Sequence, residues 1–453
     1  MMASKNPNRQ LAAVIEEAGC TYEALAREVR TVAAEAGEPL HTSRSAIHSW
    51  VAGGTPAGKT AAYLAEALTR KAKRRVTTGE IGLGCGGTKE HLGPDPLATA
   101  ADLGRYVILR RRNFLNSAFA TAAASLPLAY DHDAVTTTLR AVRSVGRVGT
   151  EEIFTVRAVT ETFRSADDKL GGGHGLSTVA VYLSDTVVPM LRAIFPSESV
   201  RRAAFGAAAE LACLVGWKHH DLGREGAAQQ FYLLGYQLAC EADPHGHAAW
   251  MMRALTHQAL DLRHMAHSVE LAEASMARAR GRVDRRTEAL LLVTAARAYG
   301  ANRMPEKASA ALLSAEDAMG ASADAVPSYA AASGPVASTV ASHMGKTLTE
   351  MKDHRAAERH YRAALEGRTA QTYQRVRGLT MANLAKSVAA QRRHEEAVIW
   401  WNRSLDLMTG VDSVRSRKEV SRVRSAMVVY EKRGVPGAAE LAQRAAELAF
   451  PSG

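Results

Sequence analysis

The stretch LVGWKHHDLGREGAAQQFYLLGYQLA, residues 214–239, decides how the C-terminal half of the chain folds. Apolar residues recur at helical spacing on both sides of Gly223, which predicts two helices joined by a short turn. Small residues lie seven positions before that glycine, at Gly216, and five and twelve positions after it, at Ala228 and Gly235. Small side chains let two helices approach closely, so the stretch predicts a tightly packed helical hairpin.

The same hairpin pattern recurs five more times toward the C-terminus. The predicted turn residues are 40, 40, 49, 40 and 41 positions apart, and they are Gly223, Arg263, Arg303, Lys352, Arg392 and Arg433. The three accompanying positions are small in every repeat: Gly216, Thr256, Ala296, Gly345, Ala385 and Ala426; Ala228, Ser268, Ala308, Ala357, Ala397 and Ala438; Gly235, Ser275, Ala315, Ala364, Ser404 and Ala445. The longest interval contains Pro327, Gly334 and Pro335 and predicts a longer loop or a kink there.

From about Arg201 onward this pattern resembles the tetratricopeptide repeat (TPR) family, although its period is longer than the family's usual period of about 34 residues. A HEAT-like solenoid is the alternative within the same class. The resemblance implies an α-solenoid of about six repeats. It also implies a concave groove, lined by the first helix of each repeat, that binds a peptide, a protein or a small effector.

Basic residues recur at the position that would face this groove. Six positions before each turn the chain has Trp217, His257, Arg297, Lys346, Lys386 and Met427. Helical spacing places Arg253 and Asn383 near the same row. The candidate groove residues are therefore Trp217, Arg253, His257, Arg297, Lys346, Asn383 and Lys386. Such a row suits an acidic peptide, a terminal carboxylate or a phosphate. The alternative is a solvated face of arginine-rich helices.

The N-terminal residues predict a small module of short helices. Helices are expected over residues 10–17, after a cap at Thr21, after a cap at Thr42 or Ser43, and over 59–71. The segments EALAREV, SRSAIHSWVAGGTP and LAEAL resemble the lambda-repressor-like (XRE-type) helix-turn-helix family. About 15 residues, from Arg27 to His41, separate the second and third helices, which is longer than that family's tight turn.

The resemblance implies that the third helix is a recognition helix that enters the major groove of double-stranded DNA. Ile47, Trp50 and Val51 would form its buried stripe. The candidate DNA-binding residues are Ser43, Arg44, Ser45, His48, Ser49, Lys59, Arg74 and Arg75. Among them Arg44 suits bidentate contact with guanine, and the later cations suit phosphates, as do Arg70, Lys71 and Lys73. The alternative is a helical module that binds only protein.

Three patterns resemble catalytic or ligand motifs. GGTPAGKT, from Gly53 to Thr60, matches the phosphate-loop pattern, but a helix rather than a buried strand is expected before it. Gly82, Gly84 and Gly87 match a dinucleotide fingerprint, but prolines follow closely and predict a linker. The histidines near His257 fit a solvated helix better than a metal site. We therefore expect no enzyme activity, no cofactor and no metal.

Composition and charge agree with a two-part regulatory protein. Hydrophobic residues make up 47% of the 453 residues, and the net charge of +11 suits a partner with phosphates. Four scattered cysteines and no apolar run long enough to span a membrane favour a cytoplasmic protein. RRRNFL, residues 110–115, resembles a twin-arginine signal, but its depth in the chain favours the start of a helix.

The sequence thus predicts an all-α fold in four parts. These are a helix-turn-helix domain at 1–78, a Gly/Pro-rich linker at 79–100, a helical connecting region at 101–200 and the TPR-like solenoid at 201–453. The combination resembles actinobacterial TPR-containing transcriptional regulators, in which an effector in the groove modulates DNA binding. A homodimer would give two recognition helices. The alternative function is an adaptor that does not bind DNA. The sequence gives no role for the glycine-rich loop at 171–175.

Overall fold

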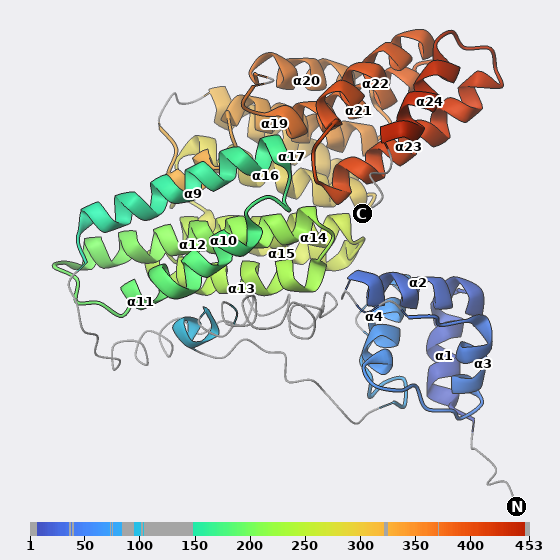
Figure 1. Ribbon diagram of the computed structural model, residues 1–453, viewed down its shortest axis with the longest axis horizontal. Coiled ribbons are helices and arrows are strands. Elements are labelled where there is room, and N and C mark those ends of the chain that lie inside the picture. Colours follow the sequence, from blue (N-terminus) through green and yellow to red (C-terminus); the bar gives the residue numbers. More distant parts are fainter. Residues whose placement is uncertain are drawn as a thin grey trace, which may run out of the picture.

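The computed structural model describes residues 7–35, 38, 40–72, 74, 76–83, 95–100, 103, 148–320, 325–369 and 371–448. Within these ranges the chain is built from helices, which confirms the expected all-α fold (Figure 1). Residues 110–128, where the twin-arginine-like stretch and the following helix were expected, lie outside the described residues.

Four helices form the N-terminal module: α1 (Arg9–Glu17), α2 (Tyr22–Glu35), α3 (Arg44–Val51) and α4 (Thr60–Ala72). The hydroxyl oxygens of Thr21 and Ser43 accept hydrogen bonds from backbone N–H groups, at Ala24 and Ala46, and cap α2 and α3 as predicted. The expected separation of about 15 residues between the second and third helices is wrong. Helix α2 continues to Glu35 because Val32 and Ala33 add two more buried positions to its apolar face.

The core of this module extends beyond the predicted boundary at residue 78. Val76 and Ile81 are buried with the helices, and Leu83 packs against them. Asn8 donates a hydrogen bond of 2.9 Å to the carbonyl oxygen of Ile81, which joins this segment to the start of α1. Further along, Leu97, Ala100 and Leu103 are buried in the core of the C-terminal array, so the expected linker is partly core.

One long helix and a run of three short helical elements precede the repeats. Helix α9 (Thr150–Leu170) packs along α12, and α10 (Leu176–Tyr182), the π-helical turn η1 (Leu183–Val187) and α11 (Val188–Met190) follow it. The described part of the expected connecting region is therefore helical.

Six helical hairpins follow (Figure 1). They are α12 (Glu198–Asp221) with α13 (Glu225–Ala242), α14 (Gly246–Asp261) with α15 (Met265–Ala279), α16 (Arg285–Ala301) with α17 (Pro305–Gly320), α19 (Val336–Glu350) with α20 (His354–Glu366), α21 (Gln374–Ala390) with α22 (His394–Met408), and α23 (Val414–Glu431) with α24 (Ala438–Leu448). Within each pair the two helices pack against one another.

The predicted turn residues have a shared backbone conformation. Gly223, Arg263, Arg303, Lys352 and Arg392 all have φ between 59° and 71°, in the left-handed region. In every hairpin the residue after the left-handed one donates its backbone N–H to the carbonyl oxygen of the residue five positions before it, at 2.8 to 3.3 Å. This hydrogen bond closes the first helix. In the last hairpin the left-handed residue is Gly434, one position after the predicted Arg433.

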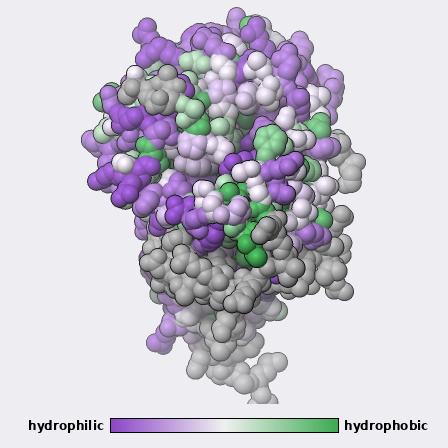
Figure 2. All heavy atoms as spheres, turned by 90° about the vertical axis from the view of Figure 1, so that its left-hand side faces the viewer, coloured by the Kyte–Doolittle hydropathy of each residue, from purple (hydrophilic) through white to green (hydrophobic). Residues whose placement is uncertain are grey.

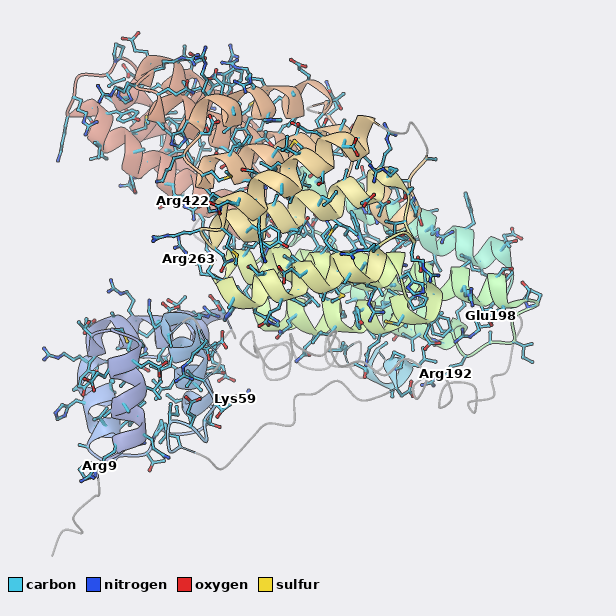
Figure 3. All side chains as sticks on the ribbon, turned by 180° about the vertical axis from the view of Figure 1, so that it is seen from behind. Arg9, Lys59, Arg192, Glu198, Arg263 and Arg422 are labelled. Atoms are coloured by element: carbon cyan, nitrogen blue, oxygen red, sulfur yellow. The ribbon has the colours of Figure 1, made fainter. Side chains whose placement is uncertain are left out.

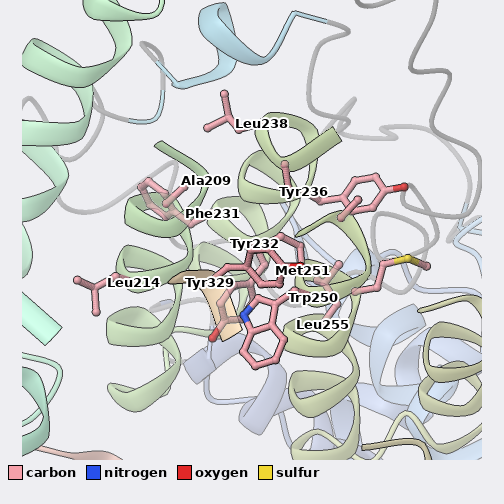
Figure 4. Packing of buried hydrophobic residues seen from close by; sticks show 14 of the residues in the cluster. Ala209, Leu214, Phe231, Tyr232, Tyr236, Leu238, Trp250, Met251, Leu255 and Tyr329 are labelled. Carbon is pink, nitrogen blue, oxygen red and sulfur yellow. The ribbon is translucent and has the colours of Figure 1, made fainter. Parts of the chain in front are cut away.

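The small positions are where the paired helices touch. The six residues five positions after the predicted turns are completely buried. A Cβ added at Gly216 would lie 2.7 Å from the ring of Tyr232, and one added at Gly345 would lie 2.7 Å from the ring of Tyr361. The glycine thus makes room for the large residue of the second helix. Figure 4 shows Tyr232 in this core beside Trp250 and Met251.

The predicted longer loop between the third and fourth hairpins contains a short helix, α18 (Ser328–Ala331). Its Ser328 donates a 2.7 Å hydrogen bond to Glu210 of α12. The ring of Tyr329 stacks on His247, with centroids 4.5 Å apart, and lies beside Trp250. The insertion therefore covers the N-terminal part of α14.

A buried ion cluster ties the first hairpin to the fifth. Arg375 of α21 donates to Asp221 of α12 at 2.8 Å and to Asp167 of α9 at 2.5 Å. Ser413, which caps α23, donates to the other oxygen of Asp221 at 2.8 Å. Lys218 bonds Asp167 at 3.3 Å. The array consequently curls until its first and later hairpins meet.

The loop at 171–175 takes part in this closure. The N–H of Gly172 donates to Asp221 at 3.0 Å, and Asp412 donates from its N–H to the carbonyl of Leu170 at 2.9 Å. A Cβ added at Gly171 would lie 2.2 Å from the carbonyl oxygen of Asp412, and one added at Gly172 would lie 2.6 Å from that of Lys218. The glycines are needed because backbone approaches backbone here.

The molecular surface is largely polar. On the face shown in Figure 2, hydrophilic side chains predominate and hydrophobic ones form small separate groups. Among the helices of the described residues, none combines the length and the apolarity needed to cross a bilayer.

The left-handed turns predict a matched set of stability changes. Gly223→Ala should lower the free energy of unfolding by about 1 kcal/mol, because φ at this position disfavours a side chain. Arg303→Gly should raise it by roughly 0.5 kcal/mol for the same reason. Arg433→Gly is the control, since Gly434 holds the left-handed position there, and it should not stabilise. Urea denaturation checks all three, and a stabilising Gly223→Ala would contradict the account.

Candidate functional site

The predicted DNA-binding residues of α3 share one exposed surface. Ser43, Arg44, Ser45, His48 and Ser49 are all exposed, whereas Ile47 is completely buried and Trp50 packs partly on the core. Ser43 also caps the helix, and its hydroxyl is 2.8 Å from that of Ser45. In Figure 1, α3 lies on the side of the module away from the hairpin array.

Arg44 is the free cation of this surface. Its guanidinium has no hydrogen bond or ion pair with any residue that the structure describes, and it begins α3 directly after the cap. A guanidinium at the first turn of a short exposed helix has its donors available for an external acceptor. Its position also leaves the helix N-terminus beside it open to an anion.

The cations predicted to contact phosphates are mostly paired within the module. Lys59 bonds Glu38 at 3.0 Å, and Arg74 forms ion pairs with Glu17 and Glu80. Arg70 pairs with Glu35 and Glu66, and Lys71 with Glu28. Arg75 and Lys73 lie outside the described residues. The local excess of positive charge expected from the sequence is thus largely balanced by acids on α1, α2 and α4 and on the segments that follow α2 and α4.

The phosphate-loop-like segment connects two helices. Gly53 has φ of 95°, and the N–H of Gly54 donates to the carbonyl of Ser49 at 2.8 Å, which ends α3. A Cβ on Gly54 would lie 2.8 Å from that same oxygen. The two glycines therefore form the stop after α3, as the helix-turn-helix interpretation required.

Inside the hairpin array, four of the predicted groove residues come together. They are Arg253 and His257 on α14, Arg297 on α16 and Lys346 on α19, and with His343 of α19 we call them the interior cationic cluster. The Arg297 guanidinium is 3.0 Å from Nδ1 of His257, and the rings of His257 and His343 stack with centroids 4.9 Å apart. Arg253 lies over the ring of Trp250 at 4.4 Å.

The protonation of His257 follows from its partner. Arginine can only donate, so Nδ1 of His257 accepts the hydrogen bond from Arg297. Burial, together with the neighbouring Arg253, Arg297 and Lys346, holds the pKa of His257 well below its usual range. The neutral ring therefore carries its proton on Nε2, a buried atom without a hydrogen-bond partner. The site thus contains an unused donor.

The cations of the cluster repel one another. Burial and the charge of Arg297 lower the pKa of Arg253, and burial with Arg297 and Arg415 lowers that of Lys346. The ammonium of Lys346 makes no hydrogen bond or ion pair with the described residues, and Arg253 has none with a carboxylate there. Arg253 is buried, and a buried cation normally has such a partner, whereas Lys346 is half-buried.

The carboxylate beside the cluster belongs to Asp261, at the end of α14. Burial acts against its charge, but a hydrogen bond from His220 and the charges of Arg415 and Arg297 hold its pKa well below the usual range. Its oxygens lie 3.2 Å from Nε2 of His220, 3.6 Å from Arg297 and 4.0 Å from Arg415. One carboxylate is therefore shared among several cations.

The remaining predicted groove residues have other neighbours. Trp217 lies under the guanidinium groups of Arg415, at 5.0 Å, and Arg375, at 6.0 Å. Lys386 forms an ion pair of 2.7 Å with Glu419 of α23, so its charge is balanced. Asn383 is half-buried on α21. Thus Lys386 and Asn383 do not join the cluster.

Sequence reasoning missed His343 and Arg415, and it considered Asp261 and His220 only as improbable metal ligands. His343 precedes Lys346 by three positions, the spacing of one helical turn, so the helical period could have identified it. Asp261 and Asp221 occupy the same position in consecutive repeats, two before the turn. Arg415 had no such signal, because only the curl of the array brings α23 to Trp217.

The N-terminal module contacts the array at the turn after α14. Glu66 of α4 is 2.9 Å from Nε2 of His264, and both side chains are buried. Figure 3 shows Arg263, the left-handed residue before His264, on the edge of the array nearest the module. Helix α14 therefore carries Arg253 and His257 and ends at this contact.

Comparison with known proteins concerns the N-terminal module alone. The sequence pattern of the SP15 N-terminal domain family matches residues 11–84. These bounds agree with a module core that continues through Leu83. No curated protein sequence matches the chain.

His220 predicts a pH-dependent stability. Burial opposes its charge, but Glu225 at 2.8 Å and Asp261 at 3.2 Å raise its pKa to about 9. Because the folded pKa lies above the unfolded one, this ion pair stabilises fully below the unfolded value and is lost as pH rises through about 9. We expect up to roughly 3 kcal/mol to be lost over that window.

The measurement is urea denaturation between pH 6.5 and 9.5. His220→Gln should flatten the pH dependence, while His245→Gln, at an exposed histidine, serves as the matched control. A histidine-ring NMR titration that gives His220 a pKa below 7 would contradict the proposed ion pair.

Proposed function

We propose that the protein is a cytoplasmic, sequence-specific DNA-binding transcriptional regulator of the XRE-like helix-turn-helix type. Its TPR-like solenoid would bind a peptide, protein or small effector that modulates DNA binding, without enzyme activity. The observation that carries the proposal is Arg44, exposed and without an intramolecular partner at the first turn of a capped helix. Residues at the start of a recognition helix are those that meet base edges in the major groove.

The surface around Arg44 suits this role. Ser45, His48 and Ser49 add exposed hydrogen-bonding groups on the same helix, while Ile47 anchors it in the core. Arginine contacts guanine bidentately, and serine contacts bases or phosphates. Helix α3 lies on the side of the module away from the hairpins, where a duplex would approach it in this proposal (Figure 1).

The effector would act through α14. This helix carries Arg253 and His257 of the interior cationic cluster, and the turn that follows it contains His264, which contacts Glu66 of the N-terminal module. A ligand that moves α14 would therefore change the position of α4 relative to the array. In a homodimer this would alter the spacing of two recognition helices and hence operator affinity.

A specific observation favours the alternative, an adaptor that binds protein and not DNA. Lys59, Arg70, Lys71 and Arg74 are held in ion pairs, so few of the expected phosphate contacts have free charge. Binding DNA would then require these pairs to open or other cations to serve. The choice between the two functions depends on a direct test.

The test is capture of genomic DNA fragments by the purified protein, wild type beside Arg44→Ala. We expect a defined motif with the wild type and at least about tenfold weaker selection by the variant, because one bidentate contact contributes about 1–3 kcal/mol of discrimination. Arg424→Ala removes an exposed cation from α23 and is the matched control for charge.

Capture without a motif, declining only with salt, would reject the regulator and favour the adaptor. Light scattering of the free protein and of its operator complex tests the dimer. A monomer in both would exclude control through the spacing of two recognition helices.

A further inference from the structure

The interior cationic cluster carries an excess of positive charge that the protein itself does not neutralise. Arg297 lies 3.0 Å from His257, whose ring stacks on His343 one helical turn before Lys346, and both Arg297, at 3.6 Å, and Arg415, at 4.0 Å, face Asp261, while Arg253 precedes His257 by one turn of α14. Asp261 is the carboxylate they share, and the charged His220 is balanced by Glu225. Four basic side chains share this one carboxylate, so up to three positive charges are uncompensated among these described residues, and an anion bound there would favour the charged form of Lys346.

The neighbouring charged groups do not supply the missing negative charge. Asp167 and Asp221 bond Arg375 and Lys218, and Asp168 lies beside Arg375 and Arg368. On the other side, Glu210 bonds Ser328 and lies near Arg157. Because these acids already face cations of their own, the excess remains on Arg253, Arg297 and Lys346.

The polar atoms of the cluster that have no partner are suited to bind an oxyanion. The N–H donors of Lys346 have no acceptor among the described residues, and Arg253 donates there only from Nε, to the carbonyl oxygen of Leu290. Nε2 of His257 is a buried donor without a partner, as derived above. His343, 9% exposed, adds an Nδ1 atom without a partner. A fully ionised group with several oxygens satisfies such a set.

The surroundings limit the size of the ligand. Helix α18 covers α14 at the Trp250 end, and the closure around Asp221 covers the opposite end. Arg253 is 8% exposed, whereas the side chains of Asp261 and Arg415 keep 35% and 28% of their area open to solvent. The cluster is thus open to solvent beside Asp261 and Arg415 and closed at Arg253, which favours a compact ion over an extended peptide.

We infer that the interior cationic cluster binds a compact, multiply charged oxyanion of the phosphate class, held by Arg253, Arg297, Lys346 and the Nε2–H of His257. This deepens the proposed function, because the bound anion is then the effector of the solenoid. A single peptide carboxylate would neutralise only one of the three excess charges. The double charge of a phosphoryl group, or the higher charge of pyrophosphate, matches the excess better.

The experiment is calorimetry and thermal unfolding of the full-length protein with pyrophosphate, at ionic strength held constant with sodium chloride. We expect saturable binding and a higher melting temperature with pyrophosphate. Acetate at the same ionic strength should have no such effect. A response to acetate equal to that to pyrophosphate would overturn the assignment to a multiply charged anion.

Lys346→Met tests the cluster itself. Its pyrophosphate affinity should fall about tenfold to a hundredfold, because one charge-assisted contact is lost. The free variant should melt at a higher temperature than the wild type, since a repelled buried charge is removed. A lysine with a purely structural role would give the opposite change in the free protein. Lys432→Met, at the exposed end of α23, is the matched control.

Phosphorus NMR of pyrophosphate with the wild-type protein needs no variant. Broadening of the pyrophosphate lines that is lost on adding excess inorganic phosphate supports one shared site. Pyrophosphate lines that the protein does not broaden would overturn the inference. All these measurements are made without DNA. A regulator that selects a motif but ignores pyrophosphate would reject only this inference, while an adaptor with no motif that binds pyrophosphate would reject only the proposed DNA binding.

Discussion

The buried pairing of Arg375 with Asp221 and Asp167 is the contact on which the C-terminal architecture depends. It joins the end of α12, the first helix of the first hairpin, to the start of the fifth hairpin, and the glycine-rich loop and the cap of α23 add their own bonds to Asp221. Without it, six similar hairpins would form an open array. With it, the inner helices face one another across a restricted space, which is why Arg253, Arg297 and Lys346, each from a different hairpin, act on one another. The buried Arg375 is stable only when both carboxylates, Asp221 and Asp167, are present, because losing one partner leaves a buried charge uncompensated. The closure therefore depends on all these bonds together.

The repeat pattern was predictable because its physical basis is local. A left-handed residue must end each first helix, and small residues must lie at fixed distances on either side of it, so both are visible in the sequence as a register. Five predicted turn positions have this conformation, and the sixth is displaced by one because Gly434 accepts the conformation more readily than Arg433. The closure, the path of α9 and the position of α18 were not predictable, since they depend on contacts between residues more than a hundred positions apart.

The same division applies to the candidate site. Arg253, His257, Arg297 and Lys346 were found because helical spacing assigns them to one face. Lys386 belongs to the same column, yet Glu419 from the next hairpin neutralises it, and the column alone does not show which acid arrives from another helix. The cations after α3 illustrate the point more strongly. Lys59 and Arg74 belong to the same basic stretch, but Lys59 pairs with Glu38 and Arg74 with Glu17, which are distant in the sequence. Helical spacing in the sequence identifies which residues share a helix face. Only the folded structure shows which of their charges have no acidic partner. Among the described residues, Arg44 on the exposed face of α3 and Lys346 inside the array lack a partner for different reasons, one because it is exposed and the other because no acid lies beside it.

The closure between the first and fifth hairpins also bears on how the chain unfolds. In an open repeat array each hairpin contacts only its neighbours, and the ends can melt independently of the middle. Here the bonds of Arg375 span 154 and 208 residues, so the first five hairpins form a loop whose members share one another's stability. Closing such a loop requires the intervening hairpins to be largely in place, which delays this step in folding and raises the kinetic barrier. The sixth hairpin lies outside this loop: α23 is held to it through Ser413 and Glu419, and α24 packs on α22 and α23, so this hairpin can fray without opening the rest.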